Sequence, residues 1–240
     1  DAVIVDAITG NAGLAVSLGA AVAVALMNNQ VTAELASNLT SSRHLQARAQ
    51  DSLSLDTRAL GGNISAGGAA GIVIGVGRRD SNVEVKVADG AVVNVSGDAG
   101  LKALSEGRSR VRAQGASGGI VAGVNAAVVT AEDNSSASTV IGQGADLRAA
   151  ELTLSALARP QLSAEGLGVA LGGYLAMGGT VLKANANSSA ALDVQNDAQL
   201  RANSATLRAA VERNGNNPSV SASGVGVVGG FGKAFEILLL

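Results

Sequence analysis

The sequence repeats itself about every 53 residues, and this internal repeat constrains the fold more than any other feature. Residues 145–154 and 198–207 are identical at six of ten positions and lie 53 residues apart. A shared apolar position falls at Leu45, Val93, Leu147 and Leu200, in steps of 48, 54 and 53 residues. Repeats of this length are typical of solenoids, propellers and other arrays.

A second motif, rich in Gly and Val, repeats along with the first. Residues 71–76 resemble residues 119–124, and looser copies lie at 166–174 and 224–231. Composition does not shift along the chain, so we predict a single repeat array over residues 1–240. Its approximate units are 1–52, 53–100, 101–153, 154–206 and 207–240, the last of them partial. Neither end carries the polar cap that solenoids require, so we expect a fragment of a longer chain.

Within the units, apolar and polar residues alternate with the period of a β-strand. The clearest stretches are Val83–Val87, Leu53–Leu55, 109–114 and 220–223. Turn residues punctuate them at Asp89–Gly90, Ser96–Asp98, Gly142–Gly144, Asn196–Asp197 and 214–217. Hydrophobic residues make up 47% of the chain but aromatic residues only 1%, and 32 residues are Gly. Small side chains suit a thin interior between closely spaced backbones, because they cannot fill a wide core at native packing density.

We therefore predict an all-β fold, a parallel β-solenoid (β-helix) of about 50-residue repeats with about two coils per repeat. Helices over 30–53 and 203–215 are the main alternative, disfavoured by the Gly load of the apolar segments. The charge-free segment 7–33 is too short in its apolar part for a membrane-spanning helix. A transmembrane barrel or a propeller would need more aromatic residues, and no calcium β-roll motif is present.

Composition also limits function. The absence of Cys excludes thiol catalysis, disulfides and Cys-ligated metals, and a single His argues against His-rich metal sites. A net charge of −2 gives no reason to expect nucleic-acid binding. We expect no cofactor and no enzymatic activity.

The order of motifs within a unit is similar to that in a known family of repeat proteins. A Gly/Val-rich strand and an Asn/Ser stretch precede Ile141-Gly-Gln-Gly-Ala145, which is followed by Leu-x-Ala and Leu-Thr-Leu-x-Ala. This order resembles the repeat regions of large bacterial exported filamentous adhesins, of the filamentous-haemagglutinin-like and leukotoxin types. The resemblance implies a secreted or surface-anchored β-solenoid stalk without catalytic residues, located outside the bacterial cell or on its surface. It also implies an outer-membrane export partner and contact with a host or neighbouring cell surface.

Arg108, Arg110 and Arg112, hereafter the arginine row, are the sharpest candidate site. On a strand all three side chains point the same way, at intervals of about 6.6 Å. Guanidinium groups bind carboxylate, sulfate and phosphate bidentately, so the row is a candidate stripe for anionic glycans. The alternative is a solvated face with interspersed acidic residues.

The other polar residues are interpreted as structural. His44 is expected at the surface, and Glu84 and Lys86 as an ion pair on an outer face. Acidic residues expected at turns are Glu132, Asp133, Asp193 and Asp197. Asn-x-Ser/Thr occurs at Asn38, Asn63, Asn94, Asn134 and Asn187, interpreted as turn formers or exposed positions rather than glycosylation sites.

Three functional hypotheses follow. The first is a structural or adhesive stalk segment of a giant bacterial surface or secreted protein. The second is a subunit that assembles with itself into an extracellular fibre, matrix or sheath. The third, a minor alternative, is a β-helix that binds or cleaves carbohydrate.

Overall fold

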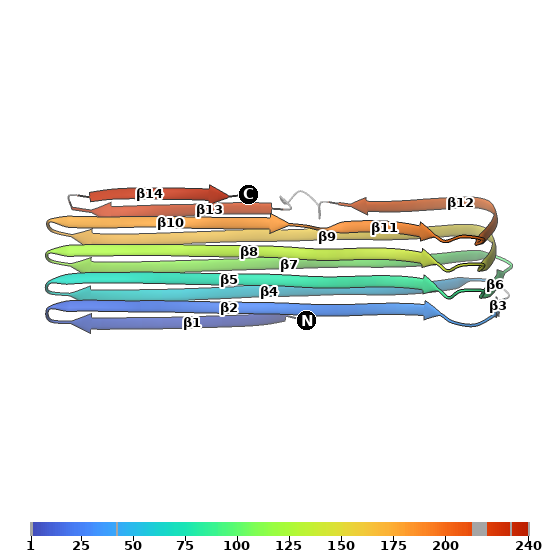
Figure 1. Ribbon diagram of the computed structural model, residues 1–240, viewed down its shortest axis with the longest axis horizontal. Helices are drawn as coiled ribbons and strands as arrows, with labels where there is room; N and C mark the ends of the chain where they lie inside the picture. Colours follow the sequence, from blue (N-terminus) through green and yellow to red (C-terminus); the bar gives the residue numbers. More distant parts are fainter. Residues whose placement is uncertain (1, 42, 213–219, 231, 240) are drawn as a thin grey trace.

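The computed structural model describes residues 2–41, 43–212, 220–230 and 232–239, and these residues form strands and turns but no helix. The strands belong to two sheets that lie against each other along their whole length (Figure 1). Sheet A contains β1 (Ala2–Gly13), β3 (Leu39–Ser41), β4 (Leu45–Ser65), β6 (Val92–Val95), β7 (Asp98–Gly119), β9 (Asp146–Gly172), β12 (Gln199–Val211) and β13 (Val220–Gly229). Sheet B contains β2 (Val16–Leu35), β5 (Gly68–Val87), β8 (Ala122–Ile141), β10 (Leu175–Ala186), β11 (Ser189–Val194) and β14 (Gly232–Leu239).

The chain winds between the sheets as a flattened coil (Figure 1). It runs along sheet A, reverses through a two-residue arch such as 120–121, and returns along sheet B. A turn at the opposite end, such as 142–145, leads it into the next coil of sheet A. We call the two ends of the coil the arch end and the turn end.

All paired strands are parallel, which confirms the predicted parallel β-solenoid. β5 pairs with β8 over 20 consecutive residues, from Gly68↔Ala122 to Val87↔Ile141. β7 pairs with β9 over 22, from Asp98↔Glu151 to Gly119↔Gly172.

Each repeat forms one coil, and the prediction of about two coils per repeat was wrong. The partners Gly68 and Ala122 lie 54 residues apart in sequence, and Asp98 and Glu151 lie 53 apart. One repeat unit therefore covers both sheets once. The strands are far longer than the usual five or six residues, so a single coil uses up the whole repeat.

The strand register confirms one predicted alignment and corrects two. Leu147 pairs with Val93 and Leu200, as the repeat predicted. The equivalent position in the preceding coil is Leu39, not Leu45, which instead pairs with Ala99. Gly71 pairs with Asn125 rather than Gly119, so the second motif was also misaligned by six residues.

The interior is thin and built from small side chains, as the composition predicted. Alternate residues of β8 face inward, and Ala127, Val129 and Ala131 among them are fully buried. Ala, Val and Leu make up most of two hydrophobic clusters, one toward the arch end and one toward the turn end. The backbones approach closely: a Cβ placed on Gly168 in sheet A would lie 2.5 Å from the carbonyl oxygen of Gly179 in sheet B.

The predicted turn residues occupy the turn end. Gly90 and Gly144 have φ of 66°, and Asp197 has φ of 61° at the corresponding place in the next coil. Left-handed backbone favours Gly, Asn and Asp, which explains the recurring choice of residues. The predicted turn at 214–217 lies outside the described residues.

The helical alternatives were wrong where the structure describes them. Within this part of the chain, residues 30–35 belong to β2, 39–41 to β3 and 45–53 to β4, and residues 203–211 belong to β12. Among the residues that the structure describes, no helix is long and apolar enough to cross a membrane.

Candidate functional site

The arginine row lies on the outer face of sheet A, with its three side chains on the same side of β7 as predicted. Each guanidinium is close to a polar or acidic side chain. Arg110 Nη2 lies 2.7 Å from Glu165 Oε1, and Arg108 Nε donates to Gln161 Oε1 at 3.2 Å. Arg112 lies 3.7 Å from Asp56 Oδ2 and 3.6 Å from Glu165 Oε2. Carboxylates from β4 and β9 thus offset much of the row's positive charge.

A small hollow of about 190 Å³ adjoins the row. Arg108, Arg110 and Glu165 line it together with Gln161, Ser163 and Ser221. It offers both donors and a carboxylate, so an anionic ligand here would have to displace Glu165 from its guanidinium partners. Glycan binding by the row stays a prediction.

A buried ionic cluster lies in the interior midway along the strands, and the sequence analysis did not find it. Arg79 projects inward from β5 and is fully buried. Its Nη2 lies 2.8 Å from Asp51 Oδ2 on β4, across the interior. Its Nη1 lies 2.9 Å from Asp133 Oδ2 on β8, in the next coil.

Hydroxyl and amide groups complete the ionic cluster. Arg79 Nη2 also donates to Ser105 Oγ at 3.2 Å. Asp51 accepts from the Ser81 hydroxyl and, at 3.0 Å, from Asn29 Nδ2. Burial raises the pKa of Asp133 above its ordinary value of 3.8, although the charge of Arg79 acts in the opposite direction. The cluster therefore ties sheet A to sheet B, and it joins the coil of β4 and β5 to the coils before and after it.

The alternation of β5 contains the signal that would have revealed this cluster. Val73, Arg79 and Val83 are all odd-numbered, so a strand continuing through Arg79 buries its side chain. Asp133 follows 54 residues later, at the distance of one coil.

Several polar residues do not lie where the sequence predicted. Glu132 and Asp133 lie within β8 and not at a turn, and Asp193 lies within β11, whereas Asp197 does occupy a turn. Asn63 faces inward from β4 and is 3% exposed, so for this residue the prediction of a turn or surface position was wrong.

The remaining candidates are consistent with surface or framework roles. His44 is exposed, with Nδ1 3.2 Å from Asp98 Oδ2. Glu84 and Lys86 lie on the outer face of β5, as predicted. Among the Asn-x-Ser/Thr residues, Asn38 accepts from the Val92 amide and Asn134 donates to Asp80 Oδ1.

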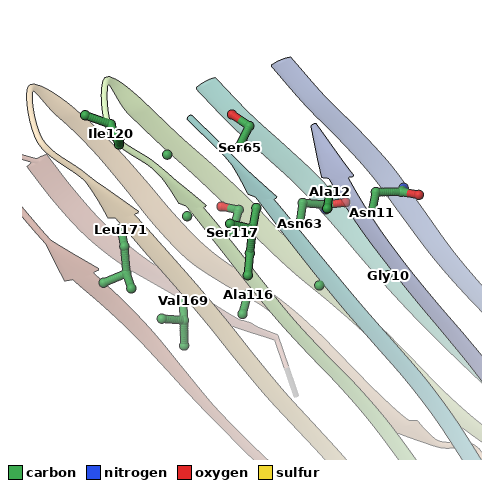
Figure 2. A pocket seen from close by; sticks show the side chains of 14 residues that line it. Gly10, Asn11, Ala12, Asn63, Ser65, Ala116, Ser117, Ile120, Val169 and Leu171 are labelled. Carbon is green, nitrogen blue, oxygen red and sulfur yellow. The ribbon is translucent and has the colours of Figure 1, made fainter. Parts of the chain in front are cut away.

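An apolar groove, which we call the arch groove, crosses the outer face of sheet A near the arch end (Figure 2). Its volume is about 760 Å³. Gly10, Gly62 and Ala116 lie in register on adjacent strands and form part of its floor. Ile64 and Leu171 also line it, so the groove runs along the stacking direction.

These sites provide buried ion pairs and an apolar packing surface. The described residues contain no group of three or more His, Cys, Asp or Glu that could hold a metal ion. The buried carboxylates are held by Arg79, and the arch groove is lined almost entirely by apolar and small residues. No protein-family model, curated protein or solved structure matches the chain.

Proposed function

We propose that this chain is a non-catalytic structural module, a stalk segment of a large bacterial surface or secreted protein whose binding tip lies elsewhere. The observation that carries the proposal is the uninterrupted strand register. Parallel pairing continues over 20 residues between β5 and β8 and over 22 between β7 and β9. A stack of such ladders resists bending, because neighbouring coils are hydrogen-bonded to each other along most of their described length.

The buried ionic cluster supports the same function. Arg79 is bonded to Asp51 in one sheet and to Asp133 in a neighbouring coil, so sliding of either sheet would leave buried charges unpaired. The resemblance to filamentous adhesins supports an extracellular location, an export partner and contact with a cell surface. Self-assembly into a fibre is a second candidate, favoured by the apolar outer faces near the arch end.

Single-molecule stretching of the chain between its two ends tests the stalk. We expect coils to detach one after another, each releasing about 190 Å of extended chain for a 53-residue coil. Deletion of residues 151–203 joins Ala150 to Ser204, the register partner of Glu151, and removes one coil. This matched variant should show one release fewer. Smooth extension without discrete releases would overturn the proposal.

A further inference from the structure

Next to the arch end, neither sheet has a charged residue in the first four of the five coils described there; in the fifth coil, Lys233 and Glu236 of β14 are in register with Met177 and Thr180. The charge-free segments are 7–33, 59–77, 113–131 and 166–182, and each contains one arch. The first charged residues along the strands, counted from the arches, lie at a similar distance from the arch end in both sheets. They are Arg58 and Arg112 in sheet A and Arg78 and Glu132 in sheet B. The arches lie together at one end of the strands (Figure 1), so the slab is divided into an apolar half next to the arches and a polar half.

Large apolar side chains of the inner coils are exposed in this half. Ile72 on β5 is 50% exposed, Ile64 on β4 is 69% exposed, and Ile120 in an arch is 69% exposed. Tyr174, in the next arch, is 79% exposed. Contiguous apolar surface of several hundred Å² is rare on soluble monomers and marks an interaction site.

The outer faces are shaped as ridges and grooves along the stacking direction. On sheet B, the ridge formed by Val22, Ile74, Val128 and Val181 is in register from coil to coil. Beside it runs a hollow of about 540 Å³, lined by Ala20, Ala126 and Leu18 among others. The arch groove is the corresponding hollow on sheet A (Figure 2).

The size of the apolar face of sheet B fits a protein interface. Ten residues along a strand span about 33 Å and four strands about 19 Å, which gives about 600 Å² per copy. Two such faces bury about 1,200 Å² together, the lower limit for a specific protein–protein interface. Each further coil of the same kind would add about 150 Å² to each face.

A second copy of this chain fits the face better than lipid does. Ridges and grooves on two copies have the same spacing, because both are set by the pleat and by the distance between strands. The chain's net charge of only −2 gives little repulsion between copies. An open sheet, by contrast, leaves unpaired backbone groups at its edges, which the hydrocarbon of a bilayer does not tolerate.

We propose that two copies pack face to face through the outer surface of the charge-free parts of β2, β5, β8 and β10 in sheet B, with the ridges of each copy seated in the grooves of the other. The inference rests on the proposed stalk, because only a free-standing rod leaves this face open. It extends the stalk to a laterally bundled fibre, in which polar halves remain in solvent while apolar halves pair.

Sedimentation equilibrium over micromolar concentrations tests the pairing. Ile72→Lys places a charge on the apolar half of β5 and should weaken self-association about a hundredfold or more, because the ammonium would be buried without a partner. Asn82→Lys is the matched control, on the outer face of the same strand in the polar half, and should leave association unchanged. Circular dichroism reports whether each variant keeps the β fold.

Two measurements on the unaltered chain keep the test independent of variant folding. Sodium sulfate should strengthen apolar association, whereas association through charged pairs weakens in salt. Small-angle X-ray scattering should show a slab about 10 Å thicker per added sheet for face-to-face pairing. An unchanged thickness would mean end-to-end stacking and would overturn the proposal.

Other outcomes also overturn it. A chain that stays monomeric but floats with phosphatidylcholine vesicles would identify lipid as the occupant. A chain that stays monomeric and ignores vesicles would show that the face has no partner of either kind. Both results leave the stepwise stretching of the stalk unaffected, so failure of this inference is distinguishable from failure of the proposed function.

Discussion

Replacing Arg79 with Met removes the only cation of the buried ionic cluster, and the structure sets the expected cost. Arg79 is bonded to Asp51 at 2.8 Å, to Asp133 at 2.9 Å and to Ser105 at 3.2 Å, all in the interior. Met has a similar length but no charge, so both carboxylates would remain buried without a cation. Breaking a buried ion pair in this way costs about 3–5 kcal/mol of the free energy of unfolding.

The cost should depend on pH, with a sign that follows from Asp133. Its folded-state pKa is raised above 3.8 by burial, so the folded state holds this proton more tightly than the unfolded state. The destabilisation by ionised Asp133 is therefore absent below pH 3.8 and grows as pH rises through the folded pKa. Loss of Arg79 removes the opposing charge, raises the folded pKa further and extends this window upward. The Arg79→Met variant should regain stability as pH falls from 7 toward 4.

Urea unfolding followed by circular dichroism measures both effects, and Arg78→Met is the matched control. Arg78 is the preceding residue of β5, points outward and pairs with Asp80 at the surface. Its loss should cost about 1 kcal/mol or less, because exposed ion pairs contribute little. A cost for Arg79→Met no larger than that of the control, or one independent of pH, would refute the reasoning. Adding Asp51→Asn and Asp133→Asn should restore most of the loss, since the uncompensated charges disappear.

Three further predictions follow from packing, register and charge. Gly107→Ala should lower the free energy of unfolding in urea by about 2 kcal/mol, because its Cβ would collide with the Arg79 guanidinium. Gly118→Ala, on the same strand but with open space around it, should lower that free energy far less. Equal losses for the two variants would contradict the packing. Removal of residues 151–203, one whole coil, should keep a cooperative thermal unfolding transition. Removal of residues 151–198 shifts the strand register by five residues, so inward-facing side chains would face outward. This second deletion should abolish the cooperative transition. Replacing the arginine row by Gln should abolish retention on a sulfated-glycan array in low salt; no retention of the parent chain on any sulfated glycan would eliminate this site.

The fold class was predictable because two independent patterns agree on it. A repeat of about 53 residues requires an array, and alternation combined with small side chains requires thin stacked sheets. The number of coils per repeat was not predictable from the same patterns. The alternation of apolar and polar residues is interrupted by three charged residues at inward positions, Arg79, Asp51 and Asp133. In the sequence, each long strand therefore resembles several short strands.

The strand register was predictable only where the sequence is distinctive. The Leu-Arg-Ala motif aligned Leu147 with Leu200 correctly. The Gly/Val-rich motif was aligned wrongly, because its copies contain the same few residue types and match one another equally well at several offsets. Gly71 was therefore aligned with Gly119 although it pairs with Asn125. The arch groove and the apolar half depend on which residues face outward, and this becomes clear only once each coil is placed on its neighbour.

The same ambiguity explains why a costly charge is kept in the interior. Ala and Val recur at many inward positions of the thin sandwich, so a slip of two residues would lose little apolar contact except where Gly allows a close approach, as at Gly168. A two-residue slip of β4 against β5 would separate Asp51 from Arg79 and bury both charges unpaired. We infer that the ionic cluster specifies the register that the small residues leave open. Restoring stability by neutralising the cluster should therefore not restore uniqueness, and several sets of amide exchange rates are expected in the Arg79→Met, Asp51→Asn, Asp133→Asn variant. A single set, as in the parent chain, would mean that the small residues fix the register unaided.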